Sequence, residues 1–157
     1  HRTMSFQKLM MICTLIISLN QGYTQNKEKA EWYSTASKTS VKIGDELDLF
    51  FKVEIAHDWY IYAFNQKITA VPSLIANFKS NDCELIGEPK SLHEVTIINQ
   101  KTQEYTNLYS GISGGFKQRI KITGKHPTMN TIINYALVSL DTGEYELKEK
   151  KINIKIK

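Results

Sequence analysis

Residues 47–55 have the sequence LDLFFKVEI, in which every second residue is apolar. Side chains of a β-strand point alternately to the two faces of its sheet, so this period of two predicts a long strand with one buried face. The residues of that face are Leu47, Leu49, Phe51, Val53 and Ile55. We expect a turn before the strand at residues 42–45, because Gly44 can adopt a positive φ angle.

An aromatic stretch, residues 59–64, follows after a short connection at residues 56–58. The closeness of the two stretches predicts that they pair as a β-hairpin. Strands are also predicted at residues 74–78, 83–86, 92–98, 116–122, 131–138 and 146–157. Turns or loops are expected at residues 87–89, 99–106, 109–115, 124–130 and 140–144. About eight or nine short strands without a helical period predict an all-β fold, an immunoglobulin-like antiparallel β-sandwich.

The N-terminal residues have the pattern of a secretory signal peptide. Residues 9–19 are an apolar run of 11 residues, which is too short to span a bilayer as a helix. We predict a signal peptide at residues 1–24, in which residues 1–3 precede the true start. The alternatives are an uncleaved anchor and a lipid-modified Cys13. A cleaved leader predicts a periplasmic or secreted protein with no membrane span after cleavage.

The rest of the chain is predicted to be one domain of low net charge. Residues 25–40 are expected to be a polar lead-in with a short edge strand near Trp32, and residues 41–157 to be the folded domain. The whole chain has 20 basic and 16 acidic residues, and removing Arg2 and Lys8 with the leader lowers its net charge from +4 to +2. The sequence therefore predicts no nucleic-acid partner.

Removal of the leader leaves one cysteine, Cys83, which cannot form an internal disulfide. We interpret it as a buried free thiol, because no basic neighbour in the sequence would lower its pKa. The alternative hypothesis is a residual thiol redox protein that acts through Cys83. No nucleophile elbow, phosphate-binding loop or metal-ligand spacing occurs, so we predict no catalytic residue, metal site or cofactor.

Aromatic residues are concentrated in residues 59–64, and Tyr105 and Tyr109 lie near a predicted loop. We interpret most of them as core residues with amphipathic tips. Tyrosine and tryptophan also stack on sugars, so a glycan- or ligand-binding or adhesion β-sandwich is an alternative function.

Several of these stretches resemble one known family. Residues 58–62, Asp-Trp-Tyr-Ile-Tyr, and the loop at residues 66–69 are similar to a strand and loop of the N-terminal periplasmic domain of DsbD, the thiol:disulfide interchange protein. Residues 41–46, 85–89 and 109–111 resemble further segments of that domain in the same order. The resemblance covers roughly residues 30–157 and implies an immunoglobulin-like sandwich.

The resemblance also implies where the family's redox cysteines would lie, namely at Val138 and Glu144. No cysteine follows Cys83 in the chain, and neither valine nor glutamate can perform thiol–disulfide exchange. We therefore predict a redox-inactive, non-catalytic protein-binding module rather than an enzyme. The expected partner is a periplasmic thioredoxin-like or other exported protein, and the expected binding residues are Tyr62, Tyr105, Tyr109, Val138, Glu144 and Tyr145.

Overall fold

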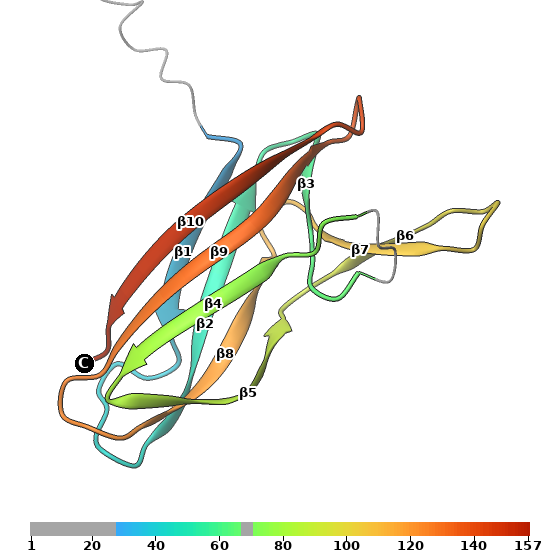
Figure 1. The fold of residues 1–157 in the computed structure, drawn as a ribbon. Coiled ribbons are helices and arrows are strands. Elements are labelled where there is room, and N and C mark those ends of the chain that lie inside the picture. Colours follow the sequence, from blue (N-terminus) through green and yellow to red (C-terminus); the bar gives the residue numbers. More distant parts are fainter. Residues whose placement is uncertain (1–27, 67–70) are drawn as a thin grey trace, which may run out of the picture.

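The computed structural model describes residues 28–66 and 71–157, and the predicted signal peptide lies outside them. The described residues form ten β-strands and no helix. The strands are β1 (Ala30–Ala36), β2 (Glu46–Ile55), β3 (Trp59–Tyr62), β4 (Ile75–Asn81), β5 (Cys83–Ser91), β6 (Val95–Ile98), β7 (Tyr105–Tyr109), β8 (Gly114–Ile122), β9 (Thr128–Ser139) and β10 (Tyr145–Lys155). They form a four-stranded sheet, β1-β2-β8-β5, and a six-stranded sheet, β10-β9-β3-β7-β6, in which β4 also pairs with β9 (Figure 1).

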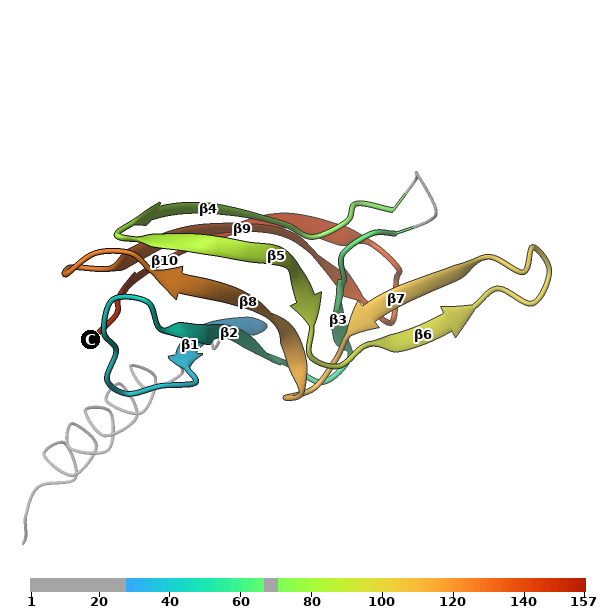
Figure 2. The same ribbon diagram turned by 90° about the horizontal axis from the view of Figure 1, so that it is seen from below.

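The two sheets pack face to face around one apolar core, which confirms the predicted immunoglobulin-like β-sandwich (Figure 2). The five alternate apolar residues of β2 are all buried, as the period of two predicts. The neighbouring strand β8 places Phe116 directly opposite Phe51, and their ring centroids are 4.9 Å apart. These two rings lie at the centre of the core that holds the sheets together.

The predicted hairpin between residues 47–55 and 59–64 is wrong. β2 pairs with β1 and β8 in one sheet, whereas β3 pairs with β7 and β9 in the other. The connection between them crosses from sheet to sheet, and Asp58 takes a positive φ of 68° in it. The turn predicted at residues 109–115 likewise leads from β7 in one sheet to β8 in the other.

The short edge strand expected near Trp32 is present as β1, so the folded domain already begins within the predicted lead-in. β1 lies within the expected polar lead-in and pairs along its whole length with β2. It contributes the buried side chains of Ala30 and Trp32 to the core. The lead-in has a polar composition because the residues that alternate with these two are exposed.

β5 continues through Gly87 and Pro89, where a turn was expected. Its pairing with β8 shifts register between Ile86 and Lys90, which is the signature of a β-bulge. The buried Gln118 side chain of β8 stabilises this irregularity, because its Nε2 donates hydrogen bonds to the carbonyl oxygens of Ile86, at 3.4 Å, and Gly87, at 3.0 Å. The bulge lets one strand accommodate both a glycine and a proline.

The loop predicted at residues 99–106 is shorter than expected, because β7 begins at Tyr105. β6 and β7 form a hairpin that extends away from the body of the sandwich (Figure 2). Its tip is therefore remote from the β9–β10 turn, where the family resemblance places the redox positions.

Candidate functional site

Val138 and Glu144 lie at the turn that joins β9 to β10, but they do not face each other. Val138 is 0% exposed and pairs directly with Tyr145 on one side and Tyr60 on the other. Glu144 is exposed in the turn, where its carbonyl oxygen accepts a 3.0 Å hydrogen bond from the Ser139 N–H. Adjacent residues along a strand point to opposite faces, so Tyr145, and not Glu144, shares the face of Val138.

The face that carries Val138 is the outer side of the six-stranded sheet. Ile61 and Leu137 alternate with Tyr60 and Val138 and point into the core, so the latter two point away from it. Cross-strand partners and next-but-one neighbours extend this face over β3, β4, β9 and β10. We call the following set the outer patch: Tyr60, Tyr62, Ile75, Val138, Tyr145 and Leu147.

The outer patch is unusually apolar for a solvent-facing surface. Leu147 is 73% exposed and Ile75 is 56% exposed, and a shallow hollow between them is floored by Ala136. The rings of Tyr60 and Tyr62 meet edge to face with centroids 5.6 Å apart. Burial, together with the neighbouring Tyr62, raises the pKa of Tyr60 to about 12, so its hydroxyl is neutral at physiological pH.

Three of the six predicted binding residues, Tyr62, Val138 and Tyr145, meet in the outer patch. Tyr109 must be removed from the predicted surface, because it is fully buried in the core and its hydroxyl lies 2.6 Å from the Ser91 Oγ. Burial raises the pKa of Tyr109 above its ordinary value. Tyr105 lies on the β6–β7 hairpin and has the same strand parity as Tyr109, so it does not share the outer face.

Sequence reasoning missed Tyr60, Ile75 and Leu147 as members of the patch. For Leu147 a signal was present, because it is an apolar residue between the charged Glu146 and Lys148 in a strand whose other half has inward-facing isoleucines. For Ile75, the alternation along β4 shows which residues share a face of the strand, but it does not show which of the two faces packs against the core.

Cys83 is buried, as interpreted from the sequence. Its Sγ–H donates a 3.4 Å hydrogen bond to the Thr128 carbonyl oxygen. Burial raises the pKa of the thiol, Asp82 raises it further, and a hydrogen bond with Ser80 lowers it in part. The thiolate needed for redox chemistry is therefore disfavoured.

We expect native Cys83 to react with a maleimide at pH 7 about a hundredfold more slowly than the same residue in denaturant, because labelling requires opening of the core. Labelling rates followed by peptide mass spectrometry test this. An Ile112→Cys variant in a Cys83→Ser background supplies a thiol in an exposed loop and should react rapidly. Equal native rates for the two thiols would contradict the burial of Cys83.

The described residues contain no group of three or more His, Cys, Asp or Glu side chains arranged to hold a metal ion. Across residues 28–66 and 71–157 there is also no helix long and apolar enough to cross a membrane.

Comparison with solved structures finds a similar fold in a periplasmic domain of another protein. One similar solved structure is the N-terminal periplasmic domain of ScsB from Proteus mirabilis, with a TM-score of 0.55 and 13% identity over 85% of this chain. The match spans about half, 49%, of that ScsB chain. At this level of identity the similarity establishes the fold alone.

Two structures from Neisseria meningitidis match with lower TM-scores. The reduced DsbD N-terminal domain has a TM-score of 0.44 and 13% identity, and the match covers 86% of this chain and 91% of that one. A complex between the DsbD and PilB N-terminal domains has a TM-score of 0.45 and 12% identity, with coverage of 84% and 87%. No protein-family model and no curated protein sequence matches the chain.

The pairing of Val138 with Tyr145 predicts which cysteine pair this scaffold accepts. Because the Ser139 N–H points toward β10, positions 138 and 145 form a non-hydrogen-bonded pair, whose Cα atoms are typically about 4.5 Å apart and within disulfide range. We expect Val138→Cys/Tyr145→Cys to oxidise to an internal disulfide in most molecules. Val138→Cys/Glu144→Cys should do so only in a small minority, because its side chains start on opposite faces. Peptide mass spectrometry after mild oxidation measures both yields, and the reverse order would show that the hairpin register is wrong.

Proposed function

We propose that this chain is a non-catalytic, exported protein-binding module whose partner, a thioredoxin-like domain, docks on the outer patch. The observation that carries the proposal is the position of Val138: a buried valine occupies the place expected for a redox cysteine, inside an exposed apolar surface. The site retains a surface for docking and has no thiol for exchange, since no cysteine follows Cys83. The sequence resemblance to the DsbD N-terminal domain supports the class of partner, and the leader pattern at residues 1–24 supports export.

The exposed side chains favour binding over a purely structural role for this face. Contiguous apolar surface on a soluble domain commonly marks an interaction site, and aromatic residues are enriched among those that dominate binding energy. Tyr145 and Leu147 project from the edge strand β10, and Tyr60 and Tyr62 lie on β3. A partner that covers all four side chains would contact both strands. The buried, weakly acidic Cys83 disfavours the alternative of a residual redox protein.

The docking proposal predicts that a charge in the outer patch weakens binding. We expect Ile75→Lys and Tyr145→Lys each to weaken the binding of thioredoxin-like periplasmic domains from the same organism by about tenfold or more, because a lysine would have to be desolvated in the interface. Calorimetric titration with the purified domains measures this. Ile43→Lys is the matched control, because Ile43 is 57% exposed and lies in the turn before β2, away from the patch. Equal losses in all three variants, or no binding by the unmodified chain, would overturn the proposal.

A further inference from the structure

The inner face of β10 changes from apolar to charged along its length. Near its end, Ile152 and Ile154 pack against the core. Near its start, Glu146 and Lys148 occupy the equivalent inward positions, opposite Leu137 and Tyr135 of β9. These charged side chains do not enter the core, because the two sheets separate here and leave an open cleft.

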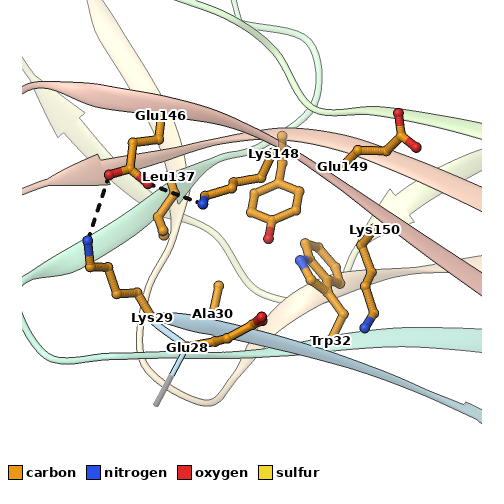
Figure 3. A pocket seen from close by; sticks show the side chains of 10 residues that line it. Glu28, Lys29, Ala30, Trp32, Leu137, Glu146, Lys148, Glu149 and Lys150 are labelled. Atoms are coloured by element: carbon orange, nitrogen blue, oxygen red, sulfur yellow. Dashed lines mark ion pairs between the residues drawn. The ribbon is translucent and has the colours of Figure 1, made fainter. Parts of the chain in front are cut away.

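The cleft lies between β1 and β10, which are edge strands of the two different sheets (Figure 3). Its volume is about 420 Å³, within the roughly 300–1,000 Å³ typical of small-molecule sites. The floor is made by Ala30, Trp32, Tyr135 and Leu137, and the rim by charged side chains. This arrangement is an apolar base surrounded by groups that hydrogen-bond.

Trp32 provides an unsatisfied donor in this floor. Trp32 is only 7% exposed. Its indole Nε1 has no hydrogen-bond partner within the described residues. The ring centroids of Trp32 and Tyr135 are 5.5 Å apart. Burial raises the pKa of the Tyr135 hydroxyl, and the Trp32 N–H lowers it in part. The two groups nevertheless do not reach hydrogen-bond geometry. In Figure 3 the indole nitrogen is on the side of the ring that faces the cleft. Buried donors are nearly always paired, so this N–H, which is near the Tyr135 hydroxyl but not bonded to it, is available to an acceptor that enters the cleft.

The rim carries two acidic and three basic side chains, which are Glu28, Glu146, Lys29, Lys148 and Lys150. The Glu149 side chain points to the opposite face of β10, where it pairs with Lys151. The Glu146 carboxylate binds both Lys148, at 3.3 Å, and Lys29, at 3.7 Å. An anionic ligand would have to displace Glu146 from these lysines, and a cationic ligand would meet three ammonium groups. A neutral ligand that both donates and accepts hydrogen bonds meets neither obstacle.

We propose that the cleft between β1 and β10 binds a neutral saccharide. A sugar hydroxyl oxygen accepts the Trp32 Nε1–H bond, and other hydroxyls donate to the Glu146 carboxylate and accept from Lys148. The apolar C–H edges of the sugar ring pack against Leu137 and the aromatic floor. This site is separate from the outer patch, which lies on the opposite face of the six-stranded sheet, and the inference does not depend on the proposed docking function.

The two tryptophans of the chain allow a direct test, because each gives one indole N–H signal in a ¹H–¹⁵N NMR spectrum. The probes are maltose, cellobiose, lactose and N,N′-diacetylchitobiose, each titrated to tens of millimolar. We expect at least one to shift the Trp32 indole proton downfield and to move the Trp59 signal less, with a Trp59→Phe variant assigning the two signals. Movement of neither signal with all four sugars, or stronger binding of glucose 6-phosphate than of any neutral sugar, would overturn the proposal.

Substitutions on one strand separate the cleft from general effects on β10. Lys148→Met should weaken binding about tenfold, because it removes a rim donor. Lys151→Met is the matched control, because Lys151 is on the opposite face of β10. Like Lys148, it forms an ion pair with the glutamate two residues earlier in the strand, here Glu149 at 3.7 Å. Trp32→Phe should abolish the shift while keeping an aromatic ring in place, and a thermal melt checks that it folds. Equal effects of the two lysine substitutions would refute the cleft as the site.

Discussion

Replacing Gly115 with alanine is expected to lower the free energy of unfolding by about 3–5 kcal/mol, a large part of the stability of a typical domain. Gly115 lies in β8 with a φ of +119°, a conformation that residues with a Cβ rarely adopt. A Cβ there would overlap the Phe51 carbonyl oxygen and lie 2.9 Å from the Lys52 Cα. Both are backbone atoms of β2, so the clash can be relieved only by separating β8 from β2.

Gly143→Ala is the matched control for this prediction. Gly143 also has a positive φ, of +73°, but an added Cβ would meet nothing within 4 Å. Its substitution should cost only the backbone strain, about 1 kcal/mol. Urea denaturation followed by far-UV circular dichroism measures both variants. A similar small loss for Gly115 and Gly143 would mean that the close approach of β8 to β2 is not maintained in solution.

The strands of this fold can largely be predicted from sequence, because burial of one face imposes a period of two. That period identifies β2 from Leu47 to Ile55 and the inward face of β8 from Phe116 to Ile122. The same period is hard to detect in β1, because only Ala30 and Trp32 are buried there and their neighbours are mostly polar. A short strand with two buried residues is difficult to distinguish from a polar linker.

The pairing of strands could not be predicted in the same way. β2 and β3 are separated by three residues, a length that suits a hairpin, yet they belong to different sheets. The period of two gives a strand one buried face but does not specify its neighbours. β5 shows a second limit, because the bulge at Gly87 is stabilised by Gln118, a residue 31 positions away in the sequence.

The candidate site was predicted in part, for a related reason. The family resemblance gives the positions of Val138 and Glu144, and the register then shows that Tyr145 is the residue opposite Val138. Tyr109 was expected at the surface because the family resemblance carries it over as part of a partner-binding surface. Its hydroxyl instead finds a partner inside the protein, Ser91, which is 18 residues away in the sequence. Long-range partners of this kind are not encoded in local pattern.

Phe116→Ala is expected to lower the free energy of unfolding by about 3–5 kcal/mol, because it leaves a cavity at the centre of the core. The Phe116 ring packs against four other aromatic rings, with centroid distances of 4.9 to 6.4 Å. The four residues are Trp32, Phe51, Phe64 and Phe78. Trp32 and Phe51 belong to the sheet of Phe116, whereas Phe78 belongs to the other sheet. The cavity would therefore weaken packing within one sheet and between the two.

Phe50→Ala provides the comparison, because Phe50 is adjacent to Phe51 on β2 but points to the outer face of its sheet. It is only half-buried, and its clearest contact is the Lys52 ammonium, 5.6 Å from the ring centroid. Its removal should cost about 1 kcal/mol or less. Denaturant titration gives both values, together with the slope that reports the surface exposed on unfolding. A cost for Phe116→Ala no greater than that for Phe50→Ala would mean that the two sheets are not held together by this aromatic cluster. In that case the outer patch and the β1–β10 cleft would lack the rigid framework on which both proposals depend.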